Sequence, residues 1–251
     1  MAIVTHKADA REIPEPDGKF HSIVTSPPYF SLRNYGDSDD EIGRGDLSNY
    51  FSHMRSCAVE WRRLLADDGV LWLNVGDTAS GSGGAGGDYA KGGQKDGKPL
   101  YRQGAVDRPS MQWLNVPHRM IEIFVEEGWL YRACITWDKA RLRAEDLRHV
   151  RRPGISHEFI FMLAKSRNHR FFDERLKERG SVWHFSPVKA MKHQAPFPAE
   201  IPLRCIPLST NEGEWVLDPF AGSGTTLVAA ENLNRNSVGV DIYGVGPIST
   251  V

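Results

Sequence analysis

Two short segments, far apart in the chain, contain residue types that can bind a small charged ligand and a planar base. The first, TSPPYF, covers residues 25–30, and the second, DPFAGSGTT, covers residues 218–226. Each follows a short apolar run that is typical of a buried parallel strand. Because ligands of open α/β sheets bind at the carboxyl ends of the strands, we expect both segments to face one crevice.

The glycine-rich segment has the features of a site for an adenosine-containing ligand. Gly222 and Gly224 have no Cβ atoms at a point where a strand gives way to a helix, so a ligand can approach the main chain closely. We expect Thr225 or Thr226 to cap this helix. Asp241 follows the next apolar run, where an acidic side chain can accept hydrogen bonds from both hydroxyls of a ribose.

The charge and the glycine spacing of this segment narrow the choice of ligand. The acidic Asp218 would repel a pyrophosphate, and the third glycine of a GxGxxG motif is missing. Both features disfavour a dinucleotide and therefore a nicotinamide-dependent oxidoreductase. A positively charged cofactor fits better, and S-adenosylmethionine has such a charge on its sulfonium and amino groups. A glycine-rich turn without a ligand is the alternative interpretation.

The residues of TSPPYF can form a pocket for a flat ring that carries an amino group. Pro27 and Pro28 have no N–H group and favour a rigid extended turn. The Ser26 hydroxyl and the Pro27 carbonyl can then accept hydrogen bonds from one amino group. Tyr29 offers a ring on which a base can stack, a contact that stabilises binding by roughly 1–3 kcal/mol. A proline turn beside a core tyrosine is the alternative interpretation.

The composition indicates one soluble, intracellular unit. The chain has 251 residues, of which 40% are hydrophobic and 25% are charged, enough for one sizeable α/β domain. Cys57, Cys134 and Cys205 are far apart and form no CxxC pair, which disfavours a disulfide framework and a metal site. No segment approaches the roughly 18 apolar residues that a membrane span needs, so we expect no membrane partner and a cytoplasmic location.

Two regions differ from the rest of the chain in composition. Residues 79–97 are rich in glycine and poor in apolar residues, so we expect a mobile loop over residues 79–110. Between residues 132 and 192 we count 15 Lys or Arg against 7 Asp or Glu, although the whole chain has a net charge of −1. We expect residues 138–192 to form a basic region for DNA binding and target recognition; a solvated surface is the alternative.

Apolar patterning predicts the elements that must position these segments. Helical spacing predicts helices over residues 47–65, 117–127 and 225–233. Short apolar runs bounded by turn residues predict strands near residues 3–5, 23–25, 70–75, 130–137, 158–164, 215–217 and 237–240. This pattern is typical of an α/β fold, and we expect a single catalytic domain over residues 1–251.

Seven motifs along nearly the whole chain resemble the beta class of DNA amino-methyltransferases. In order they are TSPPYF, LWLNVGD, ITWDK, HEFIFMLAKS, HQAPFPAEIPLRCI, VLDPFAGSGTT and VGVDI. In this class the catalytic segment precedes the cofactor segment, a circular permutation peculiar to the group among methyltransferases. The resemblance implies a Rossmann-like, S-adenosylmethionine-dependent methyltransferase fold with a mostly parallel sheet of seven strands, one of them antiparallel.

The resemblance also implies roles for individual residues. Residues 193–198 match a segment that packs over the methionine end of the cofactor. The catalytic tetrapeptide matches Ser26, Pro27, Pro28 and Tyr29. The residues implied to bind S-adenosyl-L-methionine are Asp9, Asp218, Phe220, Gly222, Ser223, Gly224, Thr225 and Asp241. The candidates for DNA contacts are Phe30, as a stacking partner of a flipped base, and, as phosphate ligands, Arg141, Arg143, Arg148, Arg151 and Arg152.

The expected activity is methylation of the exocyclic amino group of a flipped base in double-stranded DNA. Serine at the first tetrapeptide position is in this class more typical of cytosine N4 methylation, and adenine N6 is the alternative target. A non-catalytic DNA-binding or specificity partner is an alternative of another class. A cognate restriction endonuclease and a second copy of the chain are candidate partners. The chain ends in GVGPISTV without the helix that often follows Asp241, which suggests a truncated C-terminus.

Overall fold

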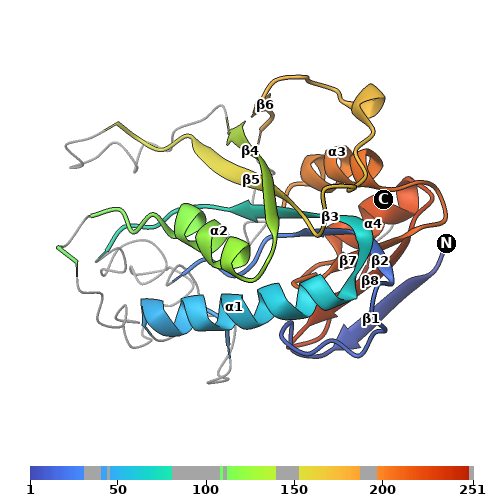
Figure 1. Cartoon of the computed structure of the whole chain (residues 1–251), viewed down its shortest axis with the longest axis horizontal. Helices are drawn as coiled ribbons and strands as arrows, with labels where there is room; N and C mark the ends of the chain where they lie inside the picture. Colours follow the sequence, from blue (N-terminus) through green and yellow to red (C-terminus); the bar gives the residue numbers. More distant parts are fainter. Residues whose placement is uncertain are drawn as a thin grey trace.

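The computed structural model of the protein describes residues 1–30, 41–43, 46–80, 108–109, 112–139, 153–186 and 197–248. Eight strands form one sheet within these residues. They are β1 (Ile3–Lys7), β2 (Phe20–Thr25), β3 (Leu65–Val75), β4 (Leu130–Asp138), β5 (His157–Ala164), β6 (Val182–His184), β7 (Trp215–Asp218) and β8 (Asn236–Asp241). Their spatial order is β1-β8-β7-β2-β3-β5-β4-β6 (Figure 1). Because β5 alone runs antiparallel to its neighbours, the sheet is mostly parallel, as the sequence predicts.

The strand order confirms the permuted methyltransferase fold. The last two strands of the chain, β7 and β8, lie between the first two, with β8 beside β1 and β7 beside β2. The C-terminal strands therefore complete the middle of the sheet. The expected seven strands are present, one of them antiparallel, and the three-residue strand β6 adds an eighth next to β4.

In the part of the chain that the structure describes, four α-helices cover the two faces of the sheet (Figure 1). On one face lie α1 (Leu47–Leu64) and α2 (Val116–Glu126), and on the other α3 (Glu200–Ser209) and α4 (Thr225–Asn232). The carboxylate of Asp46 caps α1 by accepting the N–H of Asn49 at 2.7 Å. The buried positions of α1 recur at helical spacing, so this helix turns one apolar stripe toward the sheet.

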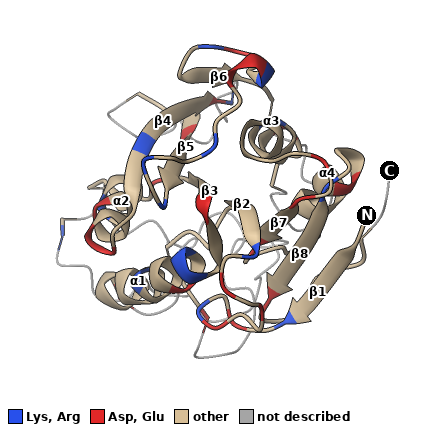
Figure 2. Cartoon of the chain, turned by 45° about the vertical axis from the view of Figure 1, so that its right-hand side comes forward, with Lys and Arg blue, Asp and Glu red and all other residues tan. Residues whose placement is uncertain are grey.

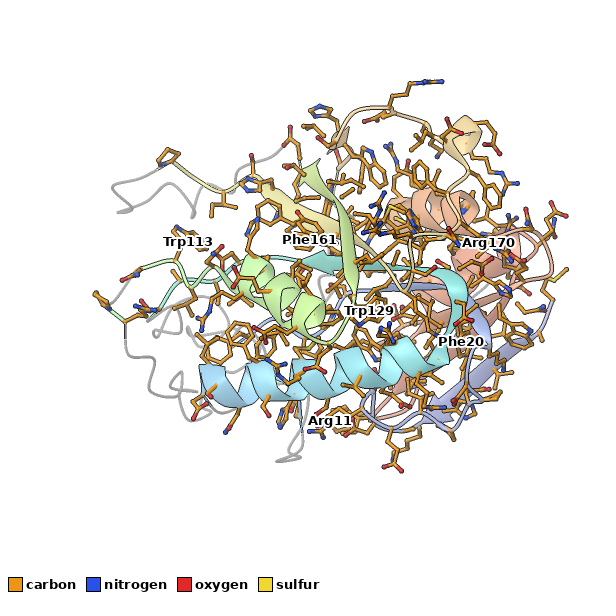
Figure 3. The ribbon with its side chains drawn as sticks, in the orientation of Figure 1. Arg11, Phe20, Trp113, Trp129, Phe161 and Arg170 are labelled. Atoms are coloured by element: carbon orange, nitrogen blue, oxygen red, sulfur yellow. The ribbon has the colours of Figure 1, made fainter. Side chains whose placement is uncertain are left out.

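Large aromatic side chains fill the layer between the sheet and the helices α1 and α2. Phe20, Trp129 and Phe161, labelled in Figure 3, belong to this core. Its buried indoles keep their hydrogen bonds, since Trp61 donates to the Ala10 carbonyl and Trp129 to the Ala58 carbonyl, each at 3.0 Å. The core thus ties α1 to the loop after β1 without leaving indole N–H groups unpaired.

Charged side chains are unevenly distributed over the strands of the sheet. β2 contains no Lys, Arg, Asp or Glu, in contrast to the charged segments of β3 and β4 (Figure 2). Among the described residues, no helix combines the length and the apolar character that crossing a membrane requires.

Most predicted elements are present with shifted ends. The helix expected over residues 47–65 ends at Leu64, and β3 begins at Leu65, five residues before the expected start. The sequence interpretation missed α3 and β6. Pro207 lies inside α3, and a proline normally argues against a helix because it has no N–H to donate. Packing of α3 against the sheet and α4 offsets this local cost.

Candidate active site

The two signature segments meet where the order of the strands reverses. Val216 and Leu217 of β7 lie beside Ser22 and Ile23 of β2. From this central pair the connections lead outward in opposite directions, to β8 on one side and to β3 on the other. Ligands of open α/β sheets bind in the crevice at such a switch point. TSPPYF follows β2 and DPFAGSGTT begins at the end of β7, so the two segments share this edge as expected.

Asp218 joins the two segments through hydrogen bonds. Its carboxylate is buried and accepts the Thr25 hydroxyl at 2.7 Å, the Thr226 hydroxyl at 2.6 Å and the Phe220 N–H at 3.1 Å. Burial raises the pKa of this carboxyl from 3.8 to about 6, although the three hydrogen bonds act to lower it. Because protein donors engage both oxygens, Asp218 holds the fold together here; its implied contact with a cofactor stays a prediction.

The turn that contains Gly222 and Gly224, called the glycine turn below, is followed by a helix that starts without a threonine cap. α4 follows Gly224, and no side chain caps its first turn. The Thr226 hydroxyl donates to Asp218 instead, and the Thr225 hydroxyl lies 3.5 Å from that of Ser223. The prediction of a threonine cap is therefore wrong, because Gly224, which has no side chain, occupies the N-cap position and both threonines lie inside the helix.

The glycine turn exposes main chain on one side and is covered on the other. Gly222 and Gly224 have φ values of 50° and 81°, a left-handed conformation that favours glycine. Beside Gly222, which is exposed, an added Cβ would meet nothing closer than 3.9 Å. Beside Gly224 it would lie 3.1 Å from Ile248, and the Gly246 N–H donates to the Gly222 carbonyl at 2.7 Å. A ligand can therefore approach the turn at Gly222.

Two acidic residues flank this turn at the ends of neighbouring strands. Asp241 is paired with Lys7 in the sheet, is partly exposed, and accepts the Tyr243 N–H at 2.8 Å. Asp9 accepts hydrogen bonds from the backbone N–H and the guanidinium of Arg11 at 2.5–2.9 Å. Partial burial acts to raise the pKa of Asp9, but these hydrogen bonds lower it overall. Open main chain at Gly222 and a partly exposed carboxylate at Asp241 fit S-adenosylmethionine.

The tetrapeptide lies at the same edge of the sheet as the glycine turn, because β2 and β7 are neighbours. Pro27 is buried, whereas Ser26, Pro28 and Tyr29 are partly buried. The Tyr50 hydroxyl of α1 donates to the Pro28 carbonyl at 3.0 Å, which fixes the proline turn to the helix. The Ser26 hydroxyl lies 3.5 Å from the Tyr29 hydroxyl, so the two side-chain hydroxyls of the tetrapeptide lie close together.

Tyr29 is held at its hydroxyl and along its ring. The hydroxyl donates to Oε2 of Glu158 at 2.7 Å and lies 3.3 Å from Oδ1 of Asn74. A Cβ at Gly76 would lie only 2.8 Å from the ring atom Cε2, so the ring needs a glycine beside it. Glu158 in turn pairs with Lys139 at 2.9 Å.

Phe30 lies in the core and is 1% exposed. Its ring packs against that of Tyr50 at a centroid distance of 5.6 Å. The prediction that Phe30 stacks on a flipped base is therefore wrong for this structure, because its ring is surrounded by core side chains. The tyrosine before it is the partly exposed ring of this segment.

The predicted phosphate ligands (Arg141, Arg143, Arg148, Arg151 and Arg152) lie outside the described residues, as does His193. Most of the glycine-rich loop expected over residues 79–110 also lies outside them. Its two ends are held together, because Ala79 forms a β-bridge with Trp113 and the Ser80 N–H donates to the Gln112 carbonyl at 2.8 Å.

The described residues contain no group of three or more His, Cys, Asp or Glu side chains arranged to hold a metal ion. Cys57 and Cys205 are buried, and burial raises the pKa of both thiols, which keeps them protonated. Neither thiol therefore provides a nucleophile at this edge.

Sequence interpretation missed four residues of this site. Thr25 lies in TSPPYF, but the sequence predicts no role for it. Its hydrogen bond to Asp218 becomes evident only when β2 and β7 are placed side by side. Asn74, Lys139 and Glu158 lie in LWLNVGD, ITWDK and HEFIFMLAKS. Asn74 and Lys139 lie at the carboxyl ends of apolar strands, which is a usable signal. Glu158 lies at the amino end of β5 and reaches this edge only because β5 runs antiparallel.

Comparison with known proteins identifies the family. The profile of the N6/N4 DNA methylases, described as DNA methylase, matches residues 20–244. The type II methyltransferase M.Cfr9I of Citrobacter freundii is 36% identical over 244 residues, which cover 90% of this chain and 78% of that protein. The type II methyltransferase M.SmaI of Serratia marcescens is 33% identical over 246 residues, covering 89% of this chain and 80% of that protein.

Solved structures agree in fold. The PvuII DNA methyltransferase (cytosine-N4-specific) superimposes with a TM-score of 0.73 at 17% identity, covering 96% of this chain and 82% of that one. A DNA modification methylase from Thermus thermophilus, solved with S-adenosyl-L-methionine, gives a TM-score of 0.66 at 24% identity over 96% and 88% of the two chains. By its profile match, its relatives and its fold, the chain belongs to the N6/N4 DNA methylase family.

Proposed function

We propose that this protein methylates N4 of cytosine in double-stranded DNA. S-adenosyl-L-methionine is the methyl donor of this family, and DNA amino-methylation is its activity. The observation that carries the proposal is the hydrogen bond between Thr25 and Asp218, which sets the tetrapeptide beside the glycine turn. An oxidoreductase, the alternative considered for the glycine-rich segment, does not agree with this family.

The choice of cytosine rests on Ser26. Serine at this position is more typical of cytosine N4 enzymes of the class, and the PvuII DNA methyltransferase, a solved neighbour of similar fold, is cytosine-N4-specific. Adenine N6 is the alternative, because its amino group offers the same two N–H donors to the same acceptors. The relatives' names as type II methyltransferases support a cognate endonuclease as partner. That partner and a homodimer both stay predictions.

The tetrapeptide would activate the amino group. An exocyclic amine of a base is a poor nucleophile because its lone pair is delocalised into the ring. The Ser26 hydroxyl and the Pro27 carbonyl would accept hydrogen bonds from its two N–H groups and localise the lone pair on nitrogen. When bound, S-adenosyl-L-methionine supplies an electrophilic methyl group. Holding both reactants in line can contribute on the order of 7–11 kcal/mol to the lowering of the barrier.

Other residues would hold the reactants. We assign the cofactor to the residues around the glycine turn and the two flanking carboxylates, with Asp218 acting through its bonds to Thr25 and Thr226. Flipping the base out of the duplex costs a few kcal/mol, which stacking on the Tyr29 ring partly offsets. The arginines of residues 141–152 are assigned to DNA phosphates, which position the duplex.

The test separates methyl transfer from cofactor binding. Ser26→Ala removes the hydroxyl acceptor, so we expect a loss of methyl transfer from labelled S-adenosyl-L-methionine to PCR-amplified genomic DNA, with an unchanged Kd for the cofactor. Ser52→Ala, an exposed serine on α1, is the matched control. Equal loss of cofactor binding and methyl transfer in Ser26→Ala, or no loss of either, would contradict the role given to Ser26.

A further inference from the structure

A polar cluster joins the tetrapeptide to β5 and to the end of β4. Tyr29 donates its hydroxyl to Oε2 of Glu158 at 2.7 Å, and Lys139 contacts the other oxygen, Oε1, at 2.9 Å. The side chains of Glu158 and Lys139 are 17% and 24% exposed, so solvent screens this pair only in part. Stacking of a base on the Tyr29 ring requires neither the charge of Glu158 nor that of Lys139.

The cluster is fixed from the strands beneath it. Glu158 and Trp137 are paired across β5 and β4, which places Lys139, two residues later, near the carboxylate. Asn74 of β3 donates from Nδ2 to the Phe159 carbonyl at 3.1 Å, and its Oδ1 faces the Tyr29 hydroxyl. The hydroxyl of Tyr29 therefore lies between acceptors on two different strands.

The positions of the protons follow from the chemistry of these groups. A carboxylate only accepts, so the single hydroxyl proton of Tyr29 points to Glu158. The lone pairs of the Tyr29 oxygen are then available to the Ser26 hydroxyl, 3.5 Å away, a long and weak contact. A serine hydroxyl that directs its proton toward Tyr29 turns its own lone pairs elsewhere. Such a serine is prepared to accept a hydrogen bond from an amino group.

We propose that Glu158, held by Lys139, is a positioning residue that orients the Tyr29 hydroxyl and through it makes Ser26 a hydrogen-bond acceptor. The proposal rests on the proposed function, because it explains how a hydroxyl that can donate or accept is kept in the accepting state. It gives a part in the reaction to a residue of the antiparallel strand β5, which lies 129 positions after Tyr29 in the sequence.

The kinetic test is a double-mutant cycle. Glu158→Gln removes the charge and keeps the shape, and Tyr29→Phe removes the hydroxyl and keeps the ring. We expect each to lower the single-turnover rate of methyl transfer by about tenfold to one-hundredfold, the effect of losing one charge-assisted hydrogen bond. The double variant should be no slower than the slower single variant, because both act through one bond. Cofactor Kd should stay unchanged.

The second measurement does not depend on activity. In protein labelled with ¹³C at Cζ of tyrosine, the NMR signal missing from Tyr29→Phe identifies Tyr29. Glu158→Gln should shift this signal, because the hydroxyl loses its carboxylate acceptor. The matched control is Glu126→Gln, an exposed carboxylate at the end of α2 that pairs with Arg55. It should change neither the signal nor the rate of methyl transfer.

The outcomes separate this proposal from the proposed function. A shifted Tyr29 signal with non-additive losses of rate supports the positioning role. An unshifted signal, a wild-type rate in Glu158→Gln, or additive losses would overturn it. If the wild-type protein transfers no methyl group to DNA, the proposed function is contradicted. The NMR signal of Tyr29 still decides in that case whether Glu158 orients the Tyr29 hydroxyl.

Discussion

The hydroxyl of Thr25 donates to the buried carboxylate of Asp218 at 2.7 Å, across 193 positions of the sequence. This bond connects the last residue of β2 to the last residue of β7, at the edge where both strands end. Asp218 also accepts the Thr226 hydroxyl of α4. One buried carboxylate therefore sets the spacing between the segment assigned to the base and the segment assigned to the cofactor.

Removing the Thr25 hydroxyl should destabilise the protein. Thr25→Val keeps the shape of the side chain but leaves the buried Asp218 without one of its donors, so we expect the free energy of unfolding to fall by about 1–3 kcal/mol. Thr5→Val, the same change at an exposed position of β1, is the control. Urea unfolding of both variants measures the difference, and equal stabilities would argue against this account of the bond.

Asp218 should make stability depend on pH. Burial raises its pKa from 3.8 to about 6, so the folded protein still holds this proton where the unfolded chain has lost it. The resulting stability is fully present below about pH 4 and is lost as the pH rises through about 6. Between about pH 5 and pH 7.5, we expect the wild type to lose roughly 1–2 kcal/mol relative to Asp218→Asn. Parallel pH curves for the two proteins would refute this.

Gly76→Ala should displace Tyr29. The new Cβ would lie 2.8 Å from the ring atom Cε2, so the ring has to move away from its place beside Glu158 and Asn74. We expect methyl transfer to slow about tenfold or more, with little change in cofactor Kd, since a shift of a positioned group is costly for catalysis. Ser52→Ala, at an exposed position of α1, is the control. Loss of cofactor binding instead would indicate a wider rearrangement.

Gly224→Ala should affect the cofactor side of the site. Its φ of 81° is strained for any residue with a Cβ, and that atom would lie 3.1 Å from Ile248. We expect stability to fall by about 1–2 kcal/mol and the Kd for S-adenosyl-L-methionine to rise, as measured by thermal unfolding and calorimetry. Gly180→Ala, where an added Cβ meets nothing within 4 Å, should change neither quantity. An unchanged cofactor Kd would remove Gly224 from the cofactor site.

Local sequence signals predict the scaffold well. The two signature segments follow apolar strands, and the carboxyl-end rule places both at one edge, as observed at Thr25 and Asp218. The glycines of DPFAGSGTT predict main chain that is open to close approach, and beside Gly222 an added Cβ would meet nothing closer than 3.9 Å. These inferences succeed because each depends on a few neighbouring residues.

Such local signals do not predict contacts between strands that are far apart in the sequence. Phe30 was expected to face a base, yet it packs against Tyr50 in the core, and burial of that kind depends on the helix that covers it. Glu158 received no role because its contact with Tyr29 requires β5 to run antiparallel beside β3. The charge of Asp218 suggests an attraction for a cofactor, whereas its oxygens accept hydrogen bonds from within the fold.

The most direct test of the central claim is nucleoside mass spectrometry of unmethylated duplex DNA after incubation with the protein and isotopically labelled S-adenosyl-L-methionine. We predict label in N4-methylcytosine. Label in N6-methyladenine would contradict the choice of base while leaving the DNA amino-methyltransferase activity in place. DNA without label, from protein that binds the cofactor, would contradict the proposal that the tetrapeptide and the glycine turn together form an active site.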